Sequence, residues 1–311
     1  MIRFTLRQLR YFDALARLGH FGRAADACAV TQPALSMQIK ELEEALGGVL
    51  IERSARQIVL TKFGEELAER VREILRSVDE LGDFARASLD QLVGRLRVGM
   101  IPTVAPYLLP KVIGNLTRMH PELDIHVRET VTPKLLQELA EGRLDAAIVA
   151  LPVSEPSLTE VALFTENFLL VRPGEEEGRP APSAEMLREM RLLLLEEGHC
   201  FREQALSFCS MQSPPREMLD ASSLSTLVQM VGAGMGVTLI PEMAVAVETR
   251  SASVSVTRFQ DPQPSRTIGM VWRRTTPLAR QLLQISEVVG ISAEALREQN
   301  APTFKAKRGG K

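Results

Sequence analysis

The sequence predicts two folded parts, a small helical domain and a larger α/β domain of two lobes, joined by one long helix. Three observations predict this organisation. Short amphipathic helical patterns fill residues 1–60, an apolar heptad pattern follows over residues 61–92, and strand and helix patterns alternate after Gly94. The chain has 311 residues, so each part is long enough to bury its own core.

Composition narrows the class of protein. Apolar residues make up 45% of the chain and charged residues 24%, which excludes disordered, collagen-like and disulfide-dense classes. Neither an apolar run of roughly 18 residues nor a secretory signal is present, so we expect a cytoplasmic protein without a membrane partner. Residues 1–62 contain nine Lys and Arg against six Asp and Glu, whereas the whole chain has a net charge of −2. A local basic surface of this kind is typical of nucleic-acid binding.

The N-terminal residues predict three short helices. The range 6–18 has an apolar stripe and ends at Gly19, and a second helix is expected over 22–28. Thr31 offers a side-chain oxygen at an N-cap position, and Pro33 suits the first turn of a third helix.

The third helix has one apolar and one polar face, because Leu35, Ile39, Leu42 and Leu46 recur at helical spacing. Residues 50–60 follow as a hairpin-like wing. The range 1–60 therefore predicts a winged helix-turn-helix whose third helix enters the major groove. The side chains expected to contact DNA are Thr31, Gln32, Pro33, Ser36, Lys40, Arg53 and Arg56. The alternative is a generic three-helix bundle with ordinary surface polar residues.

Residues 61–93 predict a long linker helix that Thr61 can cap. Apolar residues recur in heptads, interrupted only by Ser88, at Leu67, Val71, Ile74, Val78, Leu81, Ala85 and Leu92. A continuous helix over 61–92 would be about 48 Å long. We expect this stripe to form a homodimer that binds pseudo-palindromic sites in double-stranded DNA. The alternative is that the stripe packs on the chain's own domains.

Residues 6–92 resemble the DNA-binding module and linker helix of LysR-type transcriptional regulators. The segment with this resemblance is LRQLRYFDALARLGHFGRAADACAVTQPALSMQIKELEEALGGVLIER. Gly22 stands where the family usually has a hydroxyl residue, and Ile51 where it usually has Phe. The second helix is therefore expected to be capped less firmly.

The range 94–300 predicts an α/β domain with a mainly parallel sheet. It resembles the two-lobed effector domain of the same family, which is similar to periplasmic binding proteins, with lobe I at 94–165 and 266–300 and lobe II at 166–265. The glycines at 232, 234 and 236 follow a helix and precede a strand, the wrong order for a dinucleotide site, so they indicate a tight turn and no cofactor is expected. The basic tail 301–311 is expected to be disordered.

Two of the three cysteines suggest thiol chemistry. Cys200 lies beside His199 and near Arg202, groups that favour the reactive thiolate, and Cys209 follows nine residues later. If the intervening residues are helical, the two cysteines lie about 13.5 Å apart, whereas a disulfide needs a Cα separation of about 4.4–6.8 Å. A disulfide would therefore have to dismantle the helix. Cys28, among small apolar residues, is expected to be core.

The residues alone leave other interpretations open. Two buried, inert cysteines are as compatible with the spacing as a redox pair is. His199, Cys200 and Cys209 are possible zinc ligands, but no fourth ligand has useful spacing, so no metal is expected.

Four further segments resemble the peroxide-sensing members of the LysR family: LLLLEEGHCFREQALSFC, IPTVAPYLLP, SLSTLVQMVGAGMGVTLIP and RTIGMVWR. The resemblance implies that Cys200 reacts with hydrogen peroxide and that Cys209 resolves the product as a reversible disulfide. It also implies that the peroxide and the reactive thiol are surrounded by Thr103, Thr132, His199 and Arg266. The chain departs from the pattern at Glu203, where Asp is common, and at Ser265, where a basic residue is frequent.

These expectations define a regulator that senses hydrogen peroxide, activates oxidative-stress defence genes and is not an enzyme. The linker helix would form a homodimer, and additional contacts would assemble dimers into a homotetramer. RNA polymerase is a further expected partner. Two alternatives remain. One is a regulator of the same family that binds a small organic effector between the lobes, and the other is a thiol peroxidase, which would leave the N-terminal domain unexplained.

Overall fold

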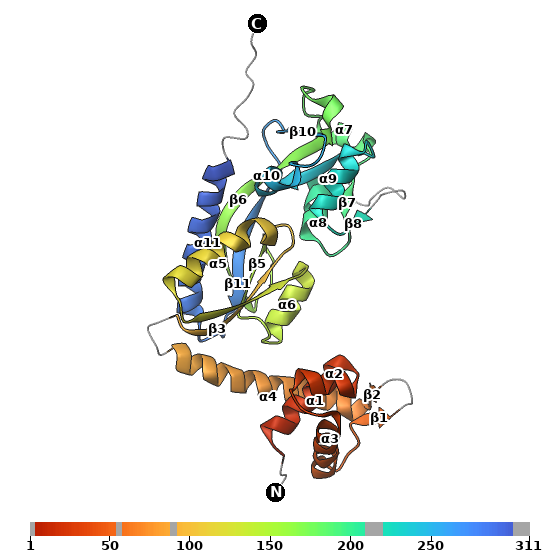
Figure 1. Cartoon of the computed structure of the whole chain (residues 1–311), viewed down its shortest axis with the longest axis vertical. Helices are drawn as coiled ribbons and strands as arrows, with labels where there is room; N and C mark the ends of the chain where they lie inside the picture. Colours follow the sequence, from red (N-terminus) through yellow and green to blue (C-terminus); the bar gives the residue numbers. More distant parts are fainter. Residues whose placement is uncertain (1–3, 54–57, 88–91, 209–219, 301–311) are drawn as a thin grey trace. The chain divides into compact units, whose positions relative to one another are not determined.

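The protein divides into two compact units, the N-terminal unit (residues 1–85) and the C-terminal unit (residues 86–311) (Figure 1). The structure is a computed structural model and describes residues 4–53, 58–87, 92–208 and 220–300. Each unit has its own hydrophobic core. Within the described ranges, no helix combines the length and the apolar character that crossing a membrane requires.

The N-terminal unit is a three-helix core with a short hairpin and one long helix. Its elements are α1 (Leu6–Leu18), α2 (Phe21–Ala27), α3 (Gln32–Leu46), β1 (Ile51–Arg53), β2 (Ile58–Leu60) and α4 (Lys62–Ala87). Phe12 and Leu15 of α1 and Leu35 and Ile39 of α3 are fully buried, because their spacing of three or four residues places them on one face of each helix. β1 and β2 pair antiparallel. The predicted winged helix-turn-helix is confirmed.

The start of α2 is capped by a histidine ring. Nδ1 of His20 accepts hydrogen bonds from the backbone N–H groups of Gly22 at 3.0 Å and Arg23 at 3.4 Å. A Cβ atom on Gly22 would lie only 3.1 Å from Cε1 of His20. The cap therefore comes from His20 rather than from the position where the family usually has a hydroxyl, and the small residue at 22 leaves room for the ring.

Two threonines were expected at helix starts. Thr61 caps α4, since its Oγ1 accepts from the backbone N–H of Gly64 at 2.9 Å, as the sequence predicted. Thr31 stands at the N-cap of α3, but its side chain makes no capping hydrogen bond. Its exposed hydroxyl is thus not used within the helix.

The apolar stripe of α4 divides into two parts. Val71 is 1% exposed and packs in the core of the N-terminal unit, whereas Ile74 is 43% exposed and Leu81 69% exposed. Leu92 does not extend the stripe, because its side chain is buried in the core of the C-terminal unit. The prediction that Leu92 lies in a dimer seam is therefore wrong, and Ser88 lies outside the described residues.

The C-terminal unit contains the remaining elements, which alternate between strand and helix. They are β3 (Gly94–Met100), α5 (Ala105–Met119), β4 (Leu123–Glu129), α6 (Thr132–Ala140), β5 (Ala146–Leu151), β6 (Leu158–Pro173), η1 (Gly174–Glu176), α7 (Ala184–Glu189), β7 (Leu194–Leu195), α8 (Cys200–Phe208), β8 (Asp220–Ala221), α9 (Leu224–Gly232), β9 (Thr238–Pro241), η2 (Glu242–Ala244), α10 (Val245–Glu248), β10 (Val254–Thr257), β11 (Ser265–Arg273) and α11 (Ala279–Asn300).

The main sheet is mixed rather than mainly parallel. Among the described residues it has seven strands in the order β10-β6-β11-β5-β3-β4, with β9 also paired to β6. Only β3 pairs parallel, with β4 and β5, and every pairing of β6 and β11 is antiparallel. β11 follows late in the chain and lies between β5 and β6, which run in the same direction, so it pairs antiparallel with both of its neighbours. The prediction of a mainly parallel sheet was wrong for this reason.

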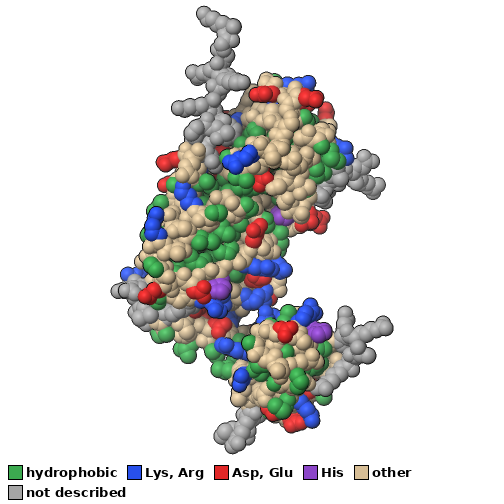
Figure 2. Space-filling model, in the orientation of Figure 1, with side chains coloured by type: hydrophobic (Ala, Val, Ile, Leu, Met, Phe, Trp, Pro, Cys, Tyr) green, Lys and Arg blue, Asp and Glu red, His purple; other side chains and the backbone are tan. Residues whose placement is uncertain are grey.

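β6 and β11 run through both lobes of the unit (Figure 1). We use lobe I for the part that contains β3, β4, β5, α5, α6 and α11, and lobe II for the part that contains β7 to β10 and α7 to α10 (Figure 1). In lobe I, α5 and α11 lie side by side, and Nδ2 of Asn115 donates to Oγ of Ser292 at 2.9 Å. Apolar side chains gather over this face (Figure 2). Among the exposed large apolar side chains of these two helices are Met119, 55% exposed, and Ile291, 62% exposed.

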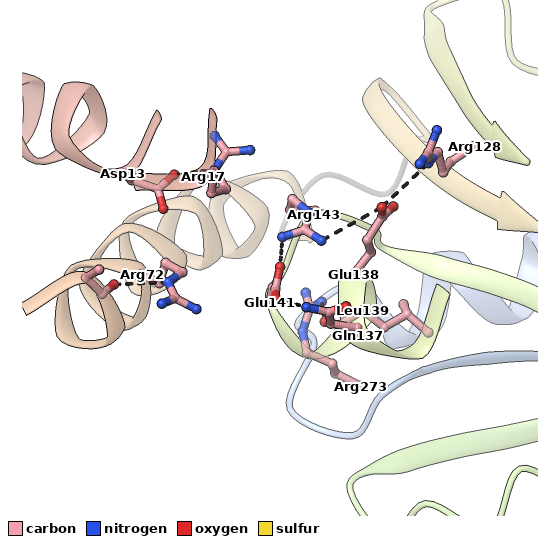
Figure 3. A network of polar contacts seen from close by, with 11 residues as sticks. Asp13, Arg17, Arg72, Arg128, Gln137, Glu138, Leu139, Glu141, Arg143 and Arg273 are labelled. Atoms are coloured by element: carbon pink, nitrogen blue, oxygen red, sulfur yellow. Dashed lines mark hydrogen bonds and ion pairs between the residues drawn. The ribbon is translucent and has the colours of Figure 1, made fainter. Parts of the chain in front are cut away.

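The end of α6 is fixed by arginines from two strands (Figure 3). Nη1 of the buried Arg273, on β11, donates to the carbonyl oxygens of Leu139 at 2.6 Å and Leu144 at 2.9 Å. Arg128 on β4 lies 3.5 Å from Glu138. Helix ends leave carbonyl groups without intrahelical partners, and Arg273 supplies a donor for that of Leu139. The position of α6, and hence of Thr132 at its start, is set by β11 and β4.

The glycine run after α9 forms a tight turn, as predicted. Gly236 has a φ of 155°, and a Cβ atom there would lie 2.3 Å from the carbonyl oxygen of Arg191. Only glycine allows the two backbone segments to approach so closely.

Candidate thiol site and DNA-binding surface

Cys200 is the first residue of α8 and is partly exposed. β7 ends at Leu195, and Nη1 of the buried Arg202 donates to the carbonyl oxygen of Leu195 at 2.7 Å. Gly198, at a φ of 92°, makes the turn between strand and helix. The first turn of α8 is therefore tied to β7, and the thiol lies at a helix N-terminus, where the helix dipole favours negative charge.

A pocket of about 580 Å³ lies beside Cys200. Thr132 and Leu136 of α6, Pro152 and Glu203 are among the residues that line it. The Oγ1 atom of Thr132 is buried and makes no hydrogen bond to any described residue. Because buried hydroxyl groups are nearly always hydrogen-bonded, this one is available to a small polar molecule in the pocket.

Neither threonine of the predicted peroxide site acts as a helix cap. The N-cap of α6 is Val131 and that of α5 is Val104, and neither helix has a side-chain capping bond. Thr103 is buried, and its Oγ1 accepts from Nη1 of Arg266 at 2.7 Å. Neither Thr103 nor Thr132 therefore serves to cap the helix that follows it.

Arg266, on β11, lies at the centre of a buried polar cluster. Its Nη2 donates to the carbonyl oxygen of Thr103 at 3.0 Å, and Nε and Nη2 donate to Oε1 of Glu166 at 2.9 and 2.8 Å. Oε2 of Glu166 accepts from the backbone N–H of Met243 at 3.1 Å. The side chains of Arg266 and Glu166 are 0% and 2% exposed. The cluster joins β6, β11, η2 and the turn between β3 and α5.

The guanidinium of Arg266 also connects the cluster to α8. Its central carbon lies 5.8 Å from the ring centroid of Phe201 and 5.9 Å from that of Phe168. The two rings meet edge to face at 5.0 Å. Phe201 directly follows Cys200, so Arg266 contacts the turn of helix that positions the thiol.

His199 is buried, and burial lowers its pKa, although Glu196 acts in the opposite direction. The imidazole is therefore neutral at neutral pH, with one nitrogen able to donate and the other to accept. His199 is suited to hydrogen bonding rather than to supplying a positive charge beside Cys200.

Cys28 differs from Cys200. It follows α2 and packs against the core of the N-terminal unit, and burial raises the pKa of its thiol. A raised pKa reduces the thiolate fraction at neutral pH. The expectation that Cys28 is core is consistent with this environment.

The structure places the predicted thiol-site residues in separate groups rather than around one pocket. Cys200 and Thr132 line one pocket, Thr103 and Arg266 are bonded directly, and His199 precedes α8. Cys209 lies outside the described residues. In the described part of the chain, no group of three or more His, Cys, Asp and Glu side chains is placed to hold a metal ion.

The sequence analysis did not single out Glu166. It also missed the hydrogen-bonded pair of Tyr107 and Glu248. Glu166 stands two residues before the buried run 168–171. An acidic residue at the edge of a core strand requires a buried partner, and that signal was present in the sequence.

The predicted DNA-binding side chains of α3 lie on its outer face. Gln32, Pro33 and Lys40 are exposed, as is Thr31, and Ser36 is partly exposed. Arg53 ends β1, but its side chain is not described, and Arg56 lies outside the described residues. Met37, which the sequence analysis did not single out, is 58% exposed on the same helix.

Comparison with known proteins identifies the family. The model described as "Bacterial regulatory helix-turn-helix protein, lysR family" matches residues 6–65, and the model "LysR substrate binding domain" matches residues 89–289. The chain belongs to the LysR family of bacterial regulators. This LysR-family regulator is 43% identical over 299 residues to a "Probable hydrogen peroxide-inducible genes activator" of Streptomyces viridosporus, covering 94% of this chain and 95% of that protein.

A second relative is the "DNA-binding transcriptional dual regulator OxyR" of Escherichia coli, 40% identical over 92% of this chain and 94% of its own length. Solved structures agree. Full-length OxyR of Pseudomonas aeruginosa, a cysteine mutant, matches with a TM-score of 0.72 and 36% identity over 95% of each chain. A mutant of Corynebacterium glutamicum OxyR with hydrogen peroxide bound matches with a TM-score of 0.67 and 33% identity, over 99% of this chain and 98% of that one.

Proposed function

We propose that this LysR-family regulator activates transcription of oxidative-stress defence genes when hydrogen peroxide oxidises Cys200. The observation on which the proposal rests is the pocket lined by both Cys200, at the N-terminus of α8, and Thr132, whose hydroxyl has no hydrogen-bond partner among the described residues. The relatives named as peroxide-inducible activators support the same function.

The chemistry needs a thiolate, hydrogen-bond donors and a proton. The thiolate of Cys200 attacks one peroxide oxygen, an S–O bond forms as the O–O bond breaks, and the departing hydroxide takes a proton to become water. Thr103 and Thr132 donate hydrogen bonds to the oxygens, Arg266 orients Thr103, and His199 supplies a neutral donor. The product is a sulfenic acid on Cys200.

Cys209 completes the reaction in this proposal. Its thiolate attacks the sulfenic sulfur, an S–S bond forms, and hydroxide leaves and is protonated to a second water. Cytosolic dithiols would reverse the disulfide by exchange.

The helix between the cysteines makes the disulfide a conformational event. α8 spans Cys200 to Phe208, which places the Cα atoms of these residues about 12 Å apart. Cys209 is one residue further, so its Cα is at least about 8 Å from that of Cys200, beyond the about 6.8 Å that a disulfide tolerates. The disulfide therefore requires α8 to open, which separates Phe201 from Phe168 and Phe208 from Phe259.

We further propose that the regulator acts as an oligomer on pseudo-palindromic DNA. The exposed half of the α4 stripe, with Ile74, Leu81 and Phe84, supplies an apolar surface for a homodimer. The apolar face over α5 and α11 supplies a second surface, which a tetramer would use. RNA polymerase is the proposed partner of the activated form.

The test uses full-length wild-type protein and the Cys200→Ser variant, treated with near-stoichiometric peroxide. Mass spectrometry maps the disulfide, and footprinting maps the DNA contacts. We expect a Cys200–Cys209 disulfide and a shifted footprint in wild type only. An equal response in the variant would overturn the proposal, and sustained peroxide consumption with an external thiol would instead indicate a thiol peroxidase.

The size of the pocket favours one second candidate. A volume of about 580 Å³ exceeds what peroxide fills and lies within the usual range for small organic ligands. In that case an organic effector would shift the footprint of Cys200→Ser as well as that of wild type, with no oxidation.

A further inference from the structure

We propose that Glu166 is a positioning residue for peroxide reduction at Cys200, acting through Arg266 on Thr103. The inference rests on the proposed function. Glu166 lies on β6, away from α8 in the sequence, and is not among the residues that the family resemblance implies. Its role follows from the hydrogen bonds of the buried cluster.

Glu166 is the ion-pair partner that holds Arg266 in the interior. Two nitrogens of Arg266 donate to Oε1 of Glu166, at 2.9 and 2.8 Å, and both side chains are almost completely buried. A buried guanidinium without a counter-charge is strongly unfavourable, so Arg266 keeps this position only while the carboxylate is present.

The carboxylate is itself fixed at both oxygens. While Oε1 accepts from Arg266, Oε2 accepts from the backbone N–H of Met243 at 3.1 Å. Met243 belongs to η2 and is buried. The carboxylate of Glu166 is therefore held in one orientation. Through it, the backbone N–H of Met243 determines the direction in which Arg266 points.

Arg266 in turn determines whether the Thr103 hydroxyl accepts or donates in each of its hydrogen bonds. Nη1 of Arg266 donates to Oγ1 of Thr103 at 2.7 Å, and Nη2 donates to the Thr103 carbonyl oxygen at 3.0 Å. Because Arg266 has only donors, Thr103 accepts from it, and the threonine proton is free to point elsewhere. The chain of bonds from Glu166 through Arg266 thus presents Thr103 as a donor to the departing peroxide oxygen.

The same guanidinium packs against the helix that holds the thiol. Its distances of 5.8 Å to the Phe201 ring and 5.9 Å to the Phe168 ring place it against the residue next to Cys200. A displaced Arg266 would therefore affect both the donor and the thiol, whereas a simple loss of packing would affect only stability.

The experiment compares two reactions of Cys200 in the reduced full-length protein. Peroxide oxidation requires donors for the departing oxygen, whereas alkylation by iodoacetamide requires only an accessible thiolate. Glu166→Gln removes the charge and presents an NH2 group to Arg266 or to the Met243 N–H. We expect the ratio of the oxidation rate constant to the alkylation rate constant to fall about tenfold or more, part of the roughly hundredfold loss for a deleted donor.

Two further variants separate positioning from structure. Glu166→Asp keeps the charge, so its ratio of oxidation to alkylation rate constants should lie between those of Glu166→Gln and wild type. Glu242→Gln is the matched control, because Glu242 also lies in η2, directly before Met243, but its carboxylate pairs with Arg258 at 2.5 Å. Its ratio should equal that of wild type. An unchanged ratio in a folded Glu166→Gln protein, or an equal fall in Glu242→Gln, would overturn the inference.

A double-mutant cycle decides the question if Glu166→Gln does not fold. Glu166→Asp should lower the ratio in the wild-type background and leave it unchanged in Thr103→Val, because the donor it positions is then missing. Equal effects in both backgrounds would refute the coupling. Wild-type protein whose Cys200 resists stoichiometric peroxide would instead refute the proposed function itself.

Discussion

The hydroxyl of Tyr107 donates a 2.6 Å hydrogen bond to Oε1 of Glu248, and the two residues lie 141 positions apart. Tyr107 is on α5 of lobe I and Glu248 on α10 of lobe II, so the bond joins the lobes. Oγ of Ser225, on α9, donates to the other carboxylate oxygen at 2.6 Å. Burial, followed by the bond to Glu248, raises the pKa of Tyr107, which keeps its proton on the phenol.

Tyr107→Phe should lower the free energy of unfolding by about 1–3 kcal/mol, because it leaves a buried carboxylate oxygen without its donor. Denaturant unfolding of the full chain would measure the loss. Ser225→Ala removes the other donor and should cost less, since Ser225 is exposed and water can replace it. A loss below about 0.5 kcal/mol for Tyr107→Phe would contradict the assignment of a buried link.

Arg273→Ala should destabilise the C-terminal unit by about 3 kcal/mol, because the carbonyl groups of Leu139 in α6 and Leu144 before β5 lose their donor and a buried stem is removed. Amide hydrogen exchange should rise in α6. The neighbouring Arg274→Ala is the control, since Arg274 is exposed and donates one bond to the Leu158 carbonyl at 3.0 Å. Equal effects of the two variants would argue against an anchoring role for Arg273.

The His20 cap of α2 predicts that Gly22→Ala has opposite effects on stability with and without the His20 ring. In wild type, Gly22→Ala should destabilise, because the new Cβ would lie 3.1 Å from the His20 ring. In a His20→Ala background the same change should stabilise, by up to about 1 kcal/mol of helix propensity. Hydrogen exchange at the Gly22 and Arg23 amides should rise in His20→Ala. The same sign in both backgrounds would rule out the coupling.

Acid should weaken the fold around His199. Burial lowers the folded pKa of His199, so below about pH 6.5 the unfolded chain binds a proton that the folded chain resists. The free energy of unfolding therefore falls as pH drops below that value, at up to about 1.4 kcal/mol per pH unit. His199→Gln should flatten the profile measured from pH 5 to 8. Parallel profiles for the two proteins would count against this prediction.

Two α3 residues should affect DNA binding differently. Gln32→Ala should lower the binding free energy for the specific DNA site by about 1–3 kcal/mol and change binding to other DNA little. Lys40→Ala should weaken binding to both kinds of DNA and reduce the slope of log binding constant against log salt concentration by about one. Arg17→Ala removes one positive charge from α1 and should leave the slope unchanged. Fluorescence anisotropy at several salt concentrations measures all three. A slope unaltered by Lys40→Ala would exclude a phosphate contact there.

Features that depend on neighbouring residues could be predicted well. The core faces of α1 and α3 and the cap at Thr61 follow from spacing and from residue preferences at helix ends. Thr103 and Thr132 came only from the family resemblance. The His20 cap was missed, because a histidine is an unusual N-cap and its ring needed the space that Gly22 leaves.

The sequence by itself determined the two units, the core faces of the first and third helices, and the separation that a helix between the two cysteines would impose on them. The tertiary structure alone decided that β6 and β11 pair antiparallel, that Leu92 is in a core, and that Glu166 and Thr103 share Arg266. Those bonds span 100 and 163 positions. Helical period and capping act within a few residues, whereas the partner of a buried charge depends on which strands become neighbours, and no local pattern specifies that.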